Sequence, residues 1–242
     1  MFKTISKCRI CGSEHLISVM ALGEQALTGV FPHSRSEKIT TGPVELVKCS
    51  GVDGCGLVQL KQSYDRNELY GMNYGCRSGL NASMVRHLHS KVAKILTLDV
   101  LEPGDLVIDI GSNDATTLRA YPENNFQLVG IDPTAIKFSS YSPTEIVLIA
   151  EFFSADVVAK ILSGKKAKII TSFSMFYDLE DPIAFAREIE ASLSDDGVWI
   201  FEQSYLPAML RTNSFDTICH EHLEFYALKQ INWITDKAGL KV

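Results

Sequence analysis

The 242-residue sequence predicts an α/β protein with an open, doubly wound, Rossmann-like parallel sheet and a small N-terminal domain built around cysteines. Three observations predict it. Apolar strand-length segments alternate with helical segments after residue 100, the first of them runs into a glycine turn, and four cysteines are spaced over the first 55 residues. Strands that are apolar on both faces are typical of parallel sheets covered by helices.

The strands of the predicted sheet are Leu106–Ile110, Gln127–Ile131, Glu145–Ala150, Lys168–Ser172 and Val198–Gln203. Between them lie predicted helices such as Ala155–Leu162 and Pro182–Leu193, and the second begins with an Asp-Pro helix-start signal. A further helix is predicted over Leu80–Leu98, before Pro103-Gly104 interrupts the pattern. The stretch up to Tyr70 is predicted to be irregular, because periodic apolar residues are sparse there.

The first predicted strand ends in a glycine turn, and the second ends in an acid, which together indicate a nucleoside site. The acid can accept both hydroxyls of a ribose, and the turn lets a ligand approach backbone N–H groups. The second and third glycines of the dinucleotide fingerprint are missing, which favours S-adenosylmethionine over NAD. The alternative is an ordinary strand–turn–helix joint. The candidate cofactor-binding residues are Asp109, Gly111, Ser112, Asn113, Asp114, Asp132, Pro133, Phe152 and Ser174.

Within that set, Phe152 and its neighbour Phe153 offer an aromatic wall for adenine, with plain core packing as an equal alternative. The end of the fourth strand, residues 172–175, is where the sulfonium of the methyl donor is expected.

Four cysteines, Cys8, Cys11, Cys49 and Cys55, form a candidate tetrahedral zinc site. The first pair has the C-x-x-C spacing that presents two thiolates to one ion, and the wider second pair contains two glycines that let its loop close. Zinc would supply folding energy to this small region. Four thiolates leave no open coordination position, so the predicted zinc is structural. Buried free thiols are the alternative.

The segment Phe215–Tyr226 is dense in groups that can move protons, above all His220, Glu221 and His222. A histidine titrates near neutral pH and suits general-base work. The spacing differs from H-E-x-x-H, and histidines two residues apart share a face only on a strand, so catalysis is favoured over a metal site.

Composition restricts the class of protein. The net charge of −6 and the pI of about 5.5 argue against unspecific binding to nucleic acid. No apolar segment is long enough for a membrane span, and the N-terminus lacks the apolar core of a secretory signal. A cytoplasmic protein is expected, without a membrane or nucleic-acid partner. The oligomeric state stays open, with a monomer as the expectation.

Four motifs in this order resemble the sugar C-methyltransferases of deoxysugar and polysaccharide biosynthesis. They are Cys8-Arg-x-Cys11-Gly, Cys55-Gly-Leu-Val-Gln-Leu60, Ile110-Gly-Ser-Asn-Asp114 and Phe215-Asp-Thr-Ile-x-His220-Glu-His222. The resemblance covers nearly the whole chain. It implies a zinc domain, a central S-adenosylmethionine domain and a C-terminal α/β domain that helps to hold a nucleotide sugar. The implied reaction is methyl transfer to a carbon, usually C3, of an NDP-linked 4-ketosugar.

The resemblance also implies residue roles. His222 is the expected base, Glu221 orients it or contacts the sugar, and His220 stabilises the enolate or shapes the pocket. The residues Tyr74, Arg77 and Ser78 match a stretch of the family that lies over the active site and are the candidate substrate-binding residues. The expected domains are residues 1–70 for zinc, 71–100 for a helical connector, 101–205 for the cofactor and 206–242 for the His-Glu-His segment.

The chain departs from the family at three places: Cys76 and Cys219 replace tyrosines, and Phe176-Tyr177-Asp178 stands where relatives often carry a histidine. The sequence ends where the C-terminal α/β domain should begin, so we expect that domain to be lacking. Two other readings stay open, an O- or N-methyltransferase and a zinc-bearing binding module.

Overall fold

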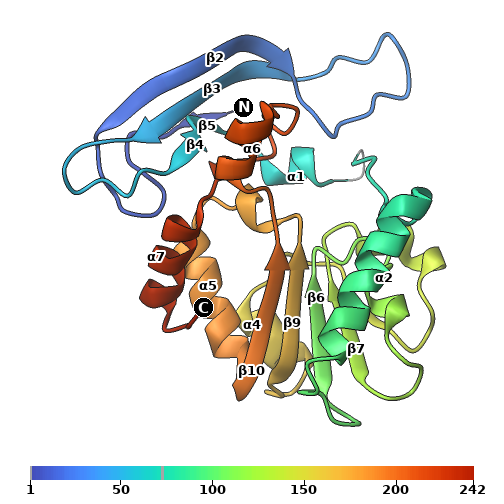
Figure 1. Ribbon diagram of the computed structural model, residues 1–242. Coiled ribbons are helices and arrows are strands. Elements are labelled where there is room, and N and C mark those ends of the chain that lie inside the picture. Colours follow the sequence, from blue (N-terminus) through green and yellow to red (C-terminus); the bar gives the residue numbers. More distant parts are fainter. Residues whose placement is uncertain (1, 72–73) are drawn as a thin grey trace. The chain divides into compact units, whose positions relative to one another are not determined.

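The computed structural model describes residues 2–71 and 74–242, and the chain forms two compact units (Figure 1). The sheet unit comprises Cys76–Phe173 and Glu188–Glu202. The cysteine unit comprises Met1–Gly75, Ser174–Arg187 and Gln203–Val242. Each unit gathers segments that are distant in sequence, whereas the four expected domains are continuous ranges. Those ranges stay a prediction, and part of the expected connector, residues 72 and 73, lies outside the described residues.

The sheet unit contains a five-stranded parallel sheet in the order β10-β9-β6-β7-β8. Its strands are β6 (Leu106–Ile110), β7 (Gln127–Ile131), β8 (Val147–Ile149), β9 (Ala167–Phe173) and β10 (Leu193–Glu202). The predicted parallel sheet is therefore confirmed, with all five strands. The strand order reverses between β6 and its neighbour β9, and such a switch point is where open α/β sheets bind ligands, at the carboxyl ends of the strands.

The core of the sheet unit explains why the predicted segments fold this way. All five residues of β6 are buried, as expected for a central parallel strand. Helix α2 (Ala82–Leu96) places Val92 and Ile95 in one cluster with Val107 of β6 and Ile169 of β9. The apolar stripe that predicted this helix is thus the stripe that covers the sheet.

The remaining helices are short. Those of the sheet unit are η1 (Ser78–Leu80), η2 (Leu118–Ala120), α3 (Ala135–Phe138), η3 (Ser139–Tyr141) and α4 (Ala155–Ile161). Helix α5 (Pro182–Ser192) runs from one unit into the other along the chain. The predicted Asp-Pro start of α5 is confirmed, because the Asp181 carboxylate accepts a hydrogen bond of 2.9 Å from the Ala184 N–H.

The cysteine unit contains a four-stranded antiparallel sheet in the order β11-β4-β3-β2. Its strands are β2 (Leu16–Ala26), β3 (Thr41–Cys49), β4 (Val58–Leu60) and β11 (Glu224–Phe225), and β1 (Lys3–Thr4) pairs separately with β5 (Gln62–Ser63). Its helical segments are α1 (Arg66–Leu69), η4 (Phe176–Asp178), α6 (Leu206–Thr212) and α7 (Leu228–Ala238). A small core of Val44, Leu46, Leu60, Leu223 and Phe225 joins strands from both ends of the sequence.

The prediction of an irregular stretch up to Tyr70 is wrong, because β2 and β3 form a long hairpin there (Figure 1). Strand β2 is mostly exposed, so it carries no period-two apolar pattern. Its pairing with β3 also shifts register between Ser18 and Met20 and again between Ala21 and Glu24. Backbone hydrogen bonds hold this strand, and side-chain alternation cannot reveal a strand of that kind.

At the end of the sequence, α7 stops at Gly239, which has the left-handed conformation (φ 81°) of a helix C-cap. Residues 240–242, which follow this cap, adopt no strand. Across the described residues, every helix is too short or too polar to cross a membrane.

Candidate functional site

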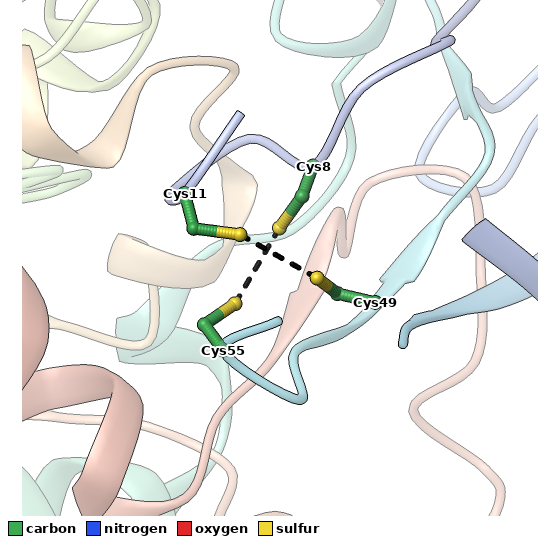
Figure 2. Close-up of side chains that lie close together, drawn as sticks. All are labelled: Cys8, Cys11, Cys49 and Cys55. Carbon is green, nitrogen blue, oxygen red and sulfur yellow. Dashed lines mark hydrogen bonds between the residues drawn. The ribbon is translucent and has the colours of Figure 1, made fainter. Parts of the chain in front are cut away.

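The four predicted zinc ligands come together in the cysteine unit (Figure 2). The Sγ atoms of Cys8, Cys11, Cys49 and Cys55 all lie within 4.8 Å of one another, and two pairs are 3.5 Å apart. Tetrahedral zinc with Zn–S bonds of about 2.3 Å separates its sulfur ligands by about 3.8 Å. The sulfur positions therefore fit a zinc ion, and four thiolates would fill its coordination shell.

Glycine-containing turns present these thiols. Gly12 has φ 73°, and its N–H closes the first turn by a 2.9 Å bond to the Cys8 carbonyl. In the second loop, a Cβ on Gly54 would lie 2.5 Å from the Ser50 oxygen, so only glycine fits there. The wide spacing between Cys49 and Cys55 is closed by this compact loop.

One of the four thiols, Cys8, favours the anionic form that a metal requires. The Cys55 thiol beside Cys8 stabilises the Cys8 thiolate and lowers the pKa of Cys8. Burial raises the pKa of Cys49. Neighbouring buried thiols that share protons are expected to have pKa values shifted in opposite directions. A bound divalent cation would favour the thiolate at all four cysteines.

Arg9, inside the C-x-x-C turn, was not among the predicted site residues. Its guanidinium donates to the Leu60 carbonyl at 2.6 Å and to the Ser63 hydroxyl at 2.8 Å. Its Nε lies 3.6 Å from the buried Glu224 carboxylate, two residues after His222. The Gln230 side chain of α7 likewise donates to the Cys55 carbonyl at 2.7 Å. The cysteine site is thus fixed by residues from both ends of the sequence, which local spacing cannot reveal.

In the sheet unit, the glycine turn follows β6 at the switch point. Gly111, Asn113 and Ala115 all have positive φ, at 70°, 53° and 60°. The Asn113 N–H donates to the Asp132 carboxylate at 2.9 Å, so the acid at the end of β7 holds the turn. The two segments that the sequence pattern indicates, the glycine turn and the acid at the end of β7, are therefore in contact.

The polar groups of this turn are suited to a nucleoside. Asp132 accepts bonds from Asn113 and from the backbone and hydroxyl of Thr134, which uses three of its roughly four acceptor positions. One acceptor position remains for a ribose hydroxyl, and contact with both hydroxyls stays a prediction. The buried Ser112 hydroxyl has no partner among the described residues and is a second candidate contact.

Asp109 lies within β6, and its side chain is bonded to the Thr171 hydroxyl of the adjacent strand β9. Burial raises the pKa of Asp109 to about 7, although the bonds from Thr171 and Thr117 oppose this. This placement makes Asp109 a support beneath the turn. Direct contact with the cofactor stays a prediction.

The remaining predicted cofactor residues lie at strand ends. Pro133 directly follows Asp132, and Phe152 follows β8 with 36% of its surface exposed. Ser174 follows β9, has φ 55° and belongs to the cysteine unit. The partial exposure of Phe152 is compatible with adenine stacking, and these three contacts stay predictions.

The three predicted substrate-binding residues are divided between the units. Tyr74 belongs to the cysteine unit, where its ring lies 5.7 Å from that of Tyr70. Arg77 and Ser78 belong to the sheet unit, where both contact the glycine turn.

His222 has the geometry of a general base. Its Nδ1 lies 2.6 Å from the Thr217 carbonyl, which can only accept, so Nδ1 carries the proton. In the neutral ring, Nε2 then holds a free electron pair. The Tyr177 ring packs at 4.4 Å against the imidazole and fixes its orientation. Local structure thus selects the tautomer in which Nε2 can accept a proton.

The Glu221 carboxylate lies close to the backbone at Gly29. A Cβ on Gly29 would lie 2.3 Å from the Glu221 carboxylate, and Gly29 itself has φ 73°. Burial raises the pKa of Glu221, while the positive charge that His222 can carry opposes the rise.

Sequence reasoning did not assign Asp178 or Tyr70, which complete this acid–base cluster. Burial raises the pKa of Asp178 well above its ordinary range, and His222 opposes the shift. Burial also raises the pKa of Tyr70, with Asp178 adding to the effect. Of these two residues, only Asp178 could have been suspected from the sequence, because it lies in the segment that follows the fourth strand, β9, which ends at Phe173. Tyr70 comes near only through tertiary folding.

His220 is placed differently from the other two residues of its motif. It is fully buried, donates from Nε2 to the Gly42 carbonyl at 3.2 Å and packs edge-on against Tyr64 at 4.7 Å. Burial lowers the pKa of His220. These contacts agree with the pocket-shaping role among its two predicted roles.

The comparisons with known proteins agree with this geometry. Residues 8–70 match a family model described as "Putative zinc binding domain", and residues 80–242 match one described as "Methyltransferase domain". The second match covers more than half of the chain. The chain belongs to the methyltransferase-domain family.

The C-methyltransferase NovU of Streptomyces niveus is 26% identical over 99% of this chain, which spans 57% of the length of NovU. The crystal structure of YcgJ from Bacillus subtilis is similar in fold, with a TM-score of 0.51 at 17% identity, covering 62% of this chain and 68% of YcgJ.

These matches confirm the predicted family of S-adenosylmethionine-dependent methyltransferases and the class of fold. The cofactor prediction is confirmed at the same level, with S-adenosylmethionine for the methyltransferase domain and zinc for the four close cysteines. The individual ligand and catalytic residues stay predictions that the geometry above supports.

Proposed function

We propose that the protein transfers a methyl group from S-adenosylmethionine to a carbon next to the keto group of an NDP-linked 4-ketosugar. One observation carries this proposal: the Thr217 carbonyl fixes the proton on Nδ1 of His222 and leaves Nε2 as a base. The C-methyltransferase activity in the name of NovU supports transfer to carbon. The nucleotide sugar rests on the family resemblance of the motifs.

A carbon next to a ketone is weakly acidic, so methylation there requires a base and stabilisation of the enolate. Nε2 of His222 removes the proton, the C–H electron pair forms the enolate, and its carbon attacks the methyl group. The methyl–sulfur bond breaks and its electron pair leaves with sulfur. Bound S-adenosylmethionine supplies the electrophilic methyl group. The proton on His222 then passes to water.

The buried carboxyls suit the charge that develops on the keto oxygen. Burial raises the pKa values of Glu221 and Asp178 and so favours the protonated form of each carboxyl, which can donate a hydrogen bond to an oxyanion. Glu221 is the residue we assign to the sugar or to the orientation of His222. Tyr74 is assigned to the acceptor, as the motif resemblance implies.

The experiment is incubation with S-adenosylmethionine and a panel of NDP-4-ketosugars in deuterated water, followed by mass spectrometry and NMR. The proposal predicts deuterium at the carbon beside the ketone and a new C-methyl group. Methylation of an oxygen or nitrogen without exchange would contradict the carbon acceptor. Cofactor binding without exchange or transfer would favour a binding module instead.

The matched variants are His222→Asn and His33→Ala. Asparagine can keep the donor to Thr217 and lacks the base, so we expect exchange and transfer to fall by about 10²- to 10⁴-fold. His33 is exposed, and its replacement should leave both rates unchanged. Unchanged exchange in His222→Asn would refute the assignment of the base.

A further inference from the structure

The segment Cys76–Gly79 lies directly on the glycine turn. The Ser78 N–H donates to the Asn113 side chain at 3.0 Å, and the Asn113 amide donates back to the Cys76 carbonyl at 3.0 Å. The Gly79 N–H donates to the Asp114 carboxylate at 3.0 Å. Two polar side chains of the turn, Asn113 and Asp114, are therefore engaged by this segment, which the resemblance had assigned to the acceptor substrate.

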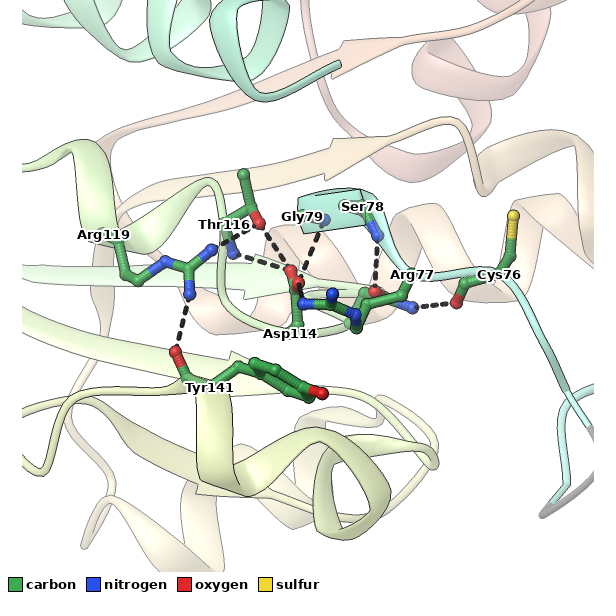
Figure 3. A network of polar contacts seen from close by, with 9 residues as sticks. Cys76, Arg77, Ser78, Gly79, Asp114, Thr116, Arg119 and Tyr141 are labelled. Atoms are coloured by element: carbon green, nitrogen blue, oxygen red, sulfur yellow. Dashed lines mark hydrogen bonds and ion pairs between the residues drawn. The ribbon is translucent and has the colours of Figure 1, made fainter. Parts of the chain in front are cut away.

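Arg77 locks the segment in place (Figure 3). Its Nη1 lies 3.3 Å from the Asp114 carboxylate, and its guanidinium lies 3.9 Å from the centre of the Tyr141 ring. The Arg77 side chain is 17% exposed and that of Asp114 is fully buried. A planar guanidinium can pair with a carboxylate while stacking on a ring, which a lysine cannot reproduce.

The contacts close into a ring. Arg119 donates to the Tyr141 carbonyl at 2.6 Å and to the Thr116 hydroxyl at 2.7 Å, and Thr116 in turn donates to Asp114 at 2.5 Å (Figure 3). The buried Asp114 carboxylate thus lies at the centre of a network that joins three segments. They are the segment before α2, the turn after β6 and the segment after α3.

The acceptor positions of Asp114 are all used inside the chain. One oxygen accepts from the backbone and hydroxyl of Thr116, and the other accepts from Gly79 and Arg77. Asp114 therefore has no free position for a ligand, and its role is to hold the turn. The approach is close: a Cβ on Gly79 would lie 2.4 Å from the carboxylate oxygen.

We infer that Arg77 is a positioning residue for the S-adenosylmethionine turn, acting through Asp114 and Tyr141, and not an acceptor-binding residue. The inference rests on the proposed cofactor site. Every second residue of the turn, Gly111, Asn113 and Ala115, has a positive φ. Surrounding contacts must maintain such a backbone conformation. Loss of Arg77 leaves a buried carboxylate without its cation, and the turn must move to hydrate it.

The test is calorimetric titration of S-adenosylmethionine into the full chain, together with the melting temperature without cofactor. Removal of one partner from a buried charge pair costs enough that we expect Arg77→Met to raise the Kd for S-adenosylmethionine at least about tenfold. Arg77→Lys should restore only part of the affinity, because lysine keeps the charge and loses the planar stack. Tyr141→Leu should weaken binding, whereas Tyr141→Phe should not.

A matched control is Arg86→Met, on the exposed surface of α2, which should keep the Kd of the wild-type protein. A double-mutant cycle with Asp114→Asn should show that the Arg77 effect shrinks when the carboxylate is absent. In steady-state assays, Arg77→Met should raise the KM for S-adenosylmethionine and leave the KM for the acceptor unchanged.

The outcomes are distinguishable. An unchanged Kd in Arg77→Met, or a raised acceptor KM alone, would overturn the positioning role and return Arg77 to the acceptor. A melting temperature that falls without any change in Kd would assign Arg77 to stability only and also overturn the inference. Failure of the wild-type protein to bind S-adenosylmethionine would refute the proposed function itself.

Discussion

The two units achieve local order by different physical means. The sheet unit buries apolar strands, and β6 is buried at every residue. The cysteine unit also buries large apolar side chains, such as Leu57, Leu60 and Phe225, but it has an exposed hairpin strand β2 and four thiols gathered at one point. A strand as exposed as β2 gains little from apolar burial, and metal coordination at the end of its partner β3 can supply another source of stability. We therefore expect zinc chelation to destabilise the cysteine unit and truncation of buried apolar side chains to destabilise the sheet unit.

The largest expected effect is removal of the zinc site. Structural zinc contributes about 10 kcal/mol or more, comparable to the whole stability of a domain at about 5–15 kcal/mol. We expect Cys49→Ser to lose zinc stoichiometry and to lose amide protection in β3 and β4, measured by metal analysis and hydrogen exchange. The exposed Cys76→Ser is the control. Retained protection in Cys49→Ser would show that the apolar core suffices.

Truncation of the sheet core should have the reverse pattern. Ile108 is fully buried in β6, and Ile108→Ala should cost about 2–5 kcal/mol in the free energy of unfolding. Denaturant titration measures the loss, and zinc stoichiometry should stay that of the wild-type protein. Ile136→Ala, at a residue that is 74% exposed, should cost little. Loss of zinc stoichiometry in Ile108→Ala would contradict this difference between the two units.

The buried Asp109 should make the stability of the sheet unit depend on pH. Its raised pKa means that the folded state holds the proton more tightly than the unfolded chain. The contribution of Asp109 to stability is therefore highest below about pH 4, falls as the pH rises to about 7 and is constant above that. Asp109→Asn should remove this loss, a gain of up to about 4 kcal/mol at pH 8 and little at pH 4.

Denaturant titrations of Asp109→Asn at these two pH values are the measurement, with the exposed Asp195→Asn as the control. An equal change in stability at both pH values would show that Asp109 stays ionised in the folded protein.

The smallest effect should come from charge at the surface of the cysteine unit. Lys7 and Glu14 form an exposed pair at 3.1 Å beside the first zinc-binding turn. Such pairs contribute little, so Lys7→Met should change the free energy of unfolding by less than about 0.5 kcal/mol. The chelator concentration that releases half of the zinc should also stay the same. A clear shift would mean that electrostatics contribute to the cysteine unit alongside the thiols.

Much of the sheet unit could be predicted because its signals are local. The apolar segments after residue 100 become β6 to β10, and the turn at Gly111 and the acid at Asp132 meet as their strand positions require. The C-x-x-C pair also follows from spacing. The hairpin of β2 and β3 could not be predicted, because an exposed strand with shifted register carries no apolar period.

The sequence by itself determined the family, the parallel sheet and the kinds of groups available for chemistry: four thiols, a turn with an acid, and a His-Glu-His segment. Tertiary structure decided which groups are free to act. It engages Asp114 with Arg77, leaves a free electron pair on Nε2 of the neutral His222 ring and buries Asp178 near that ring. The physical reason is that hydrogen-bond partners and desolvation are set by neighbours distant in sequence, which no local pattern specifies.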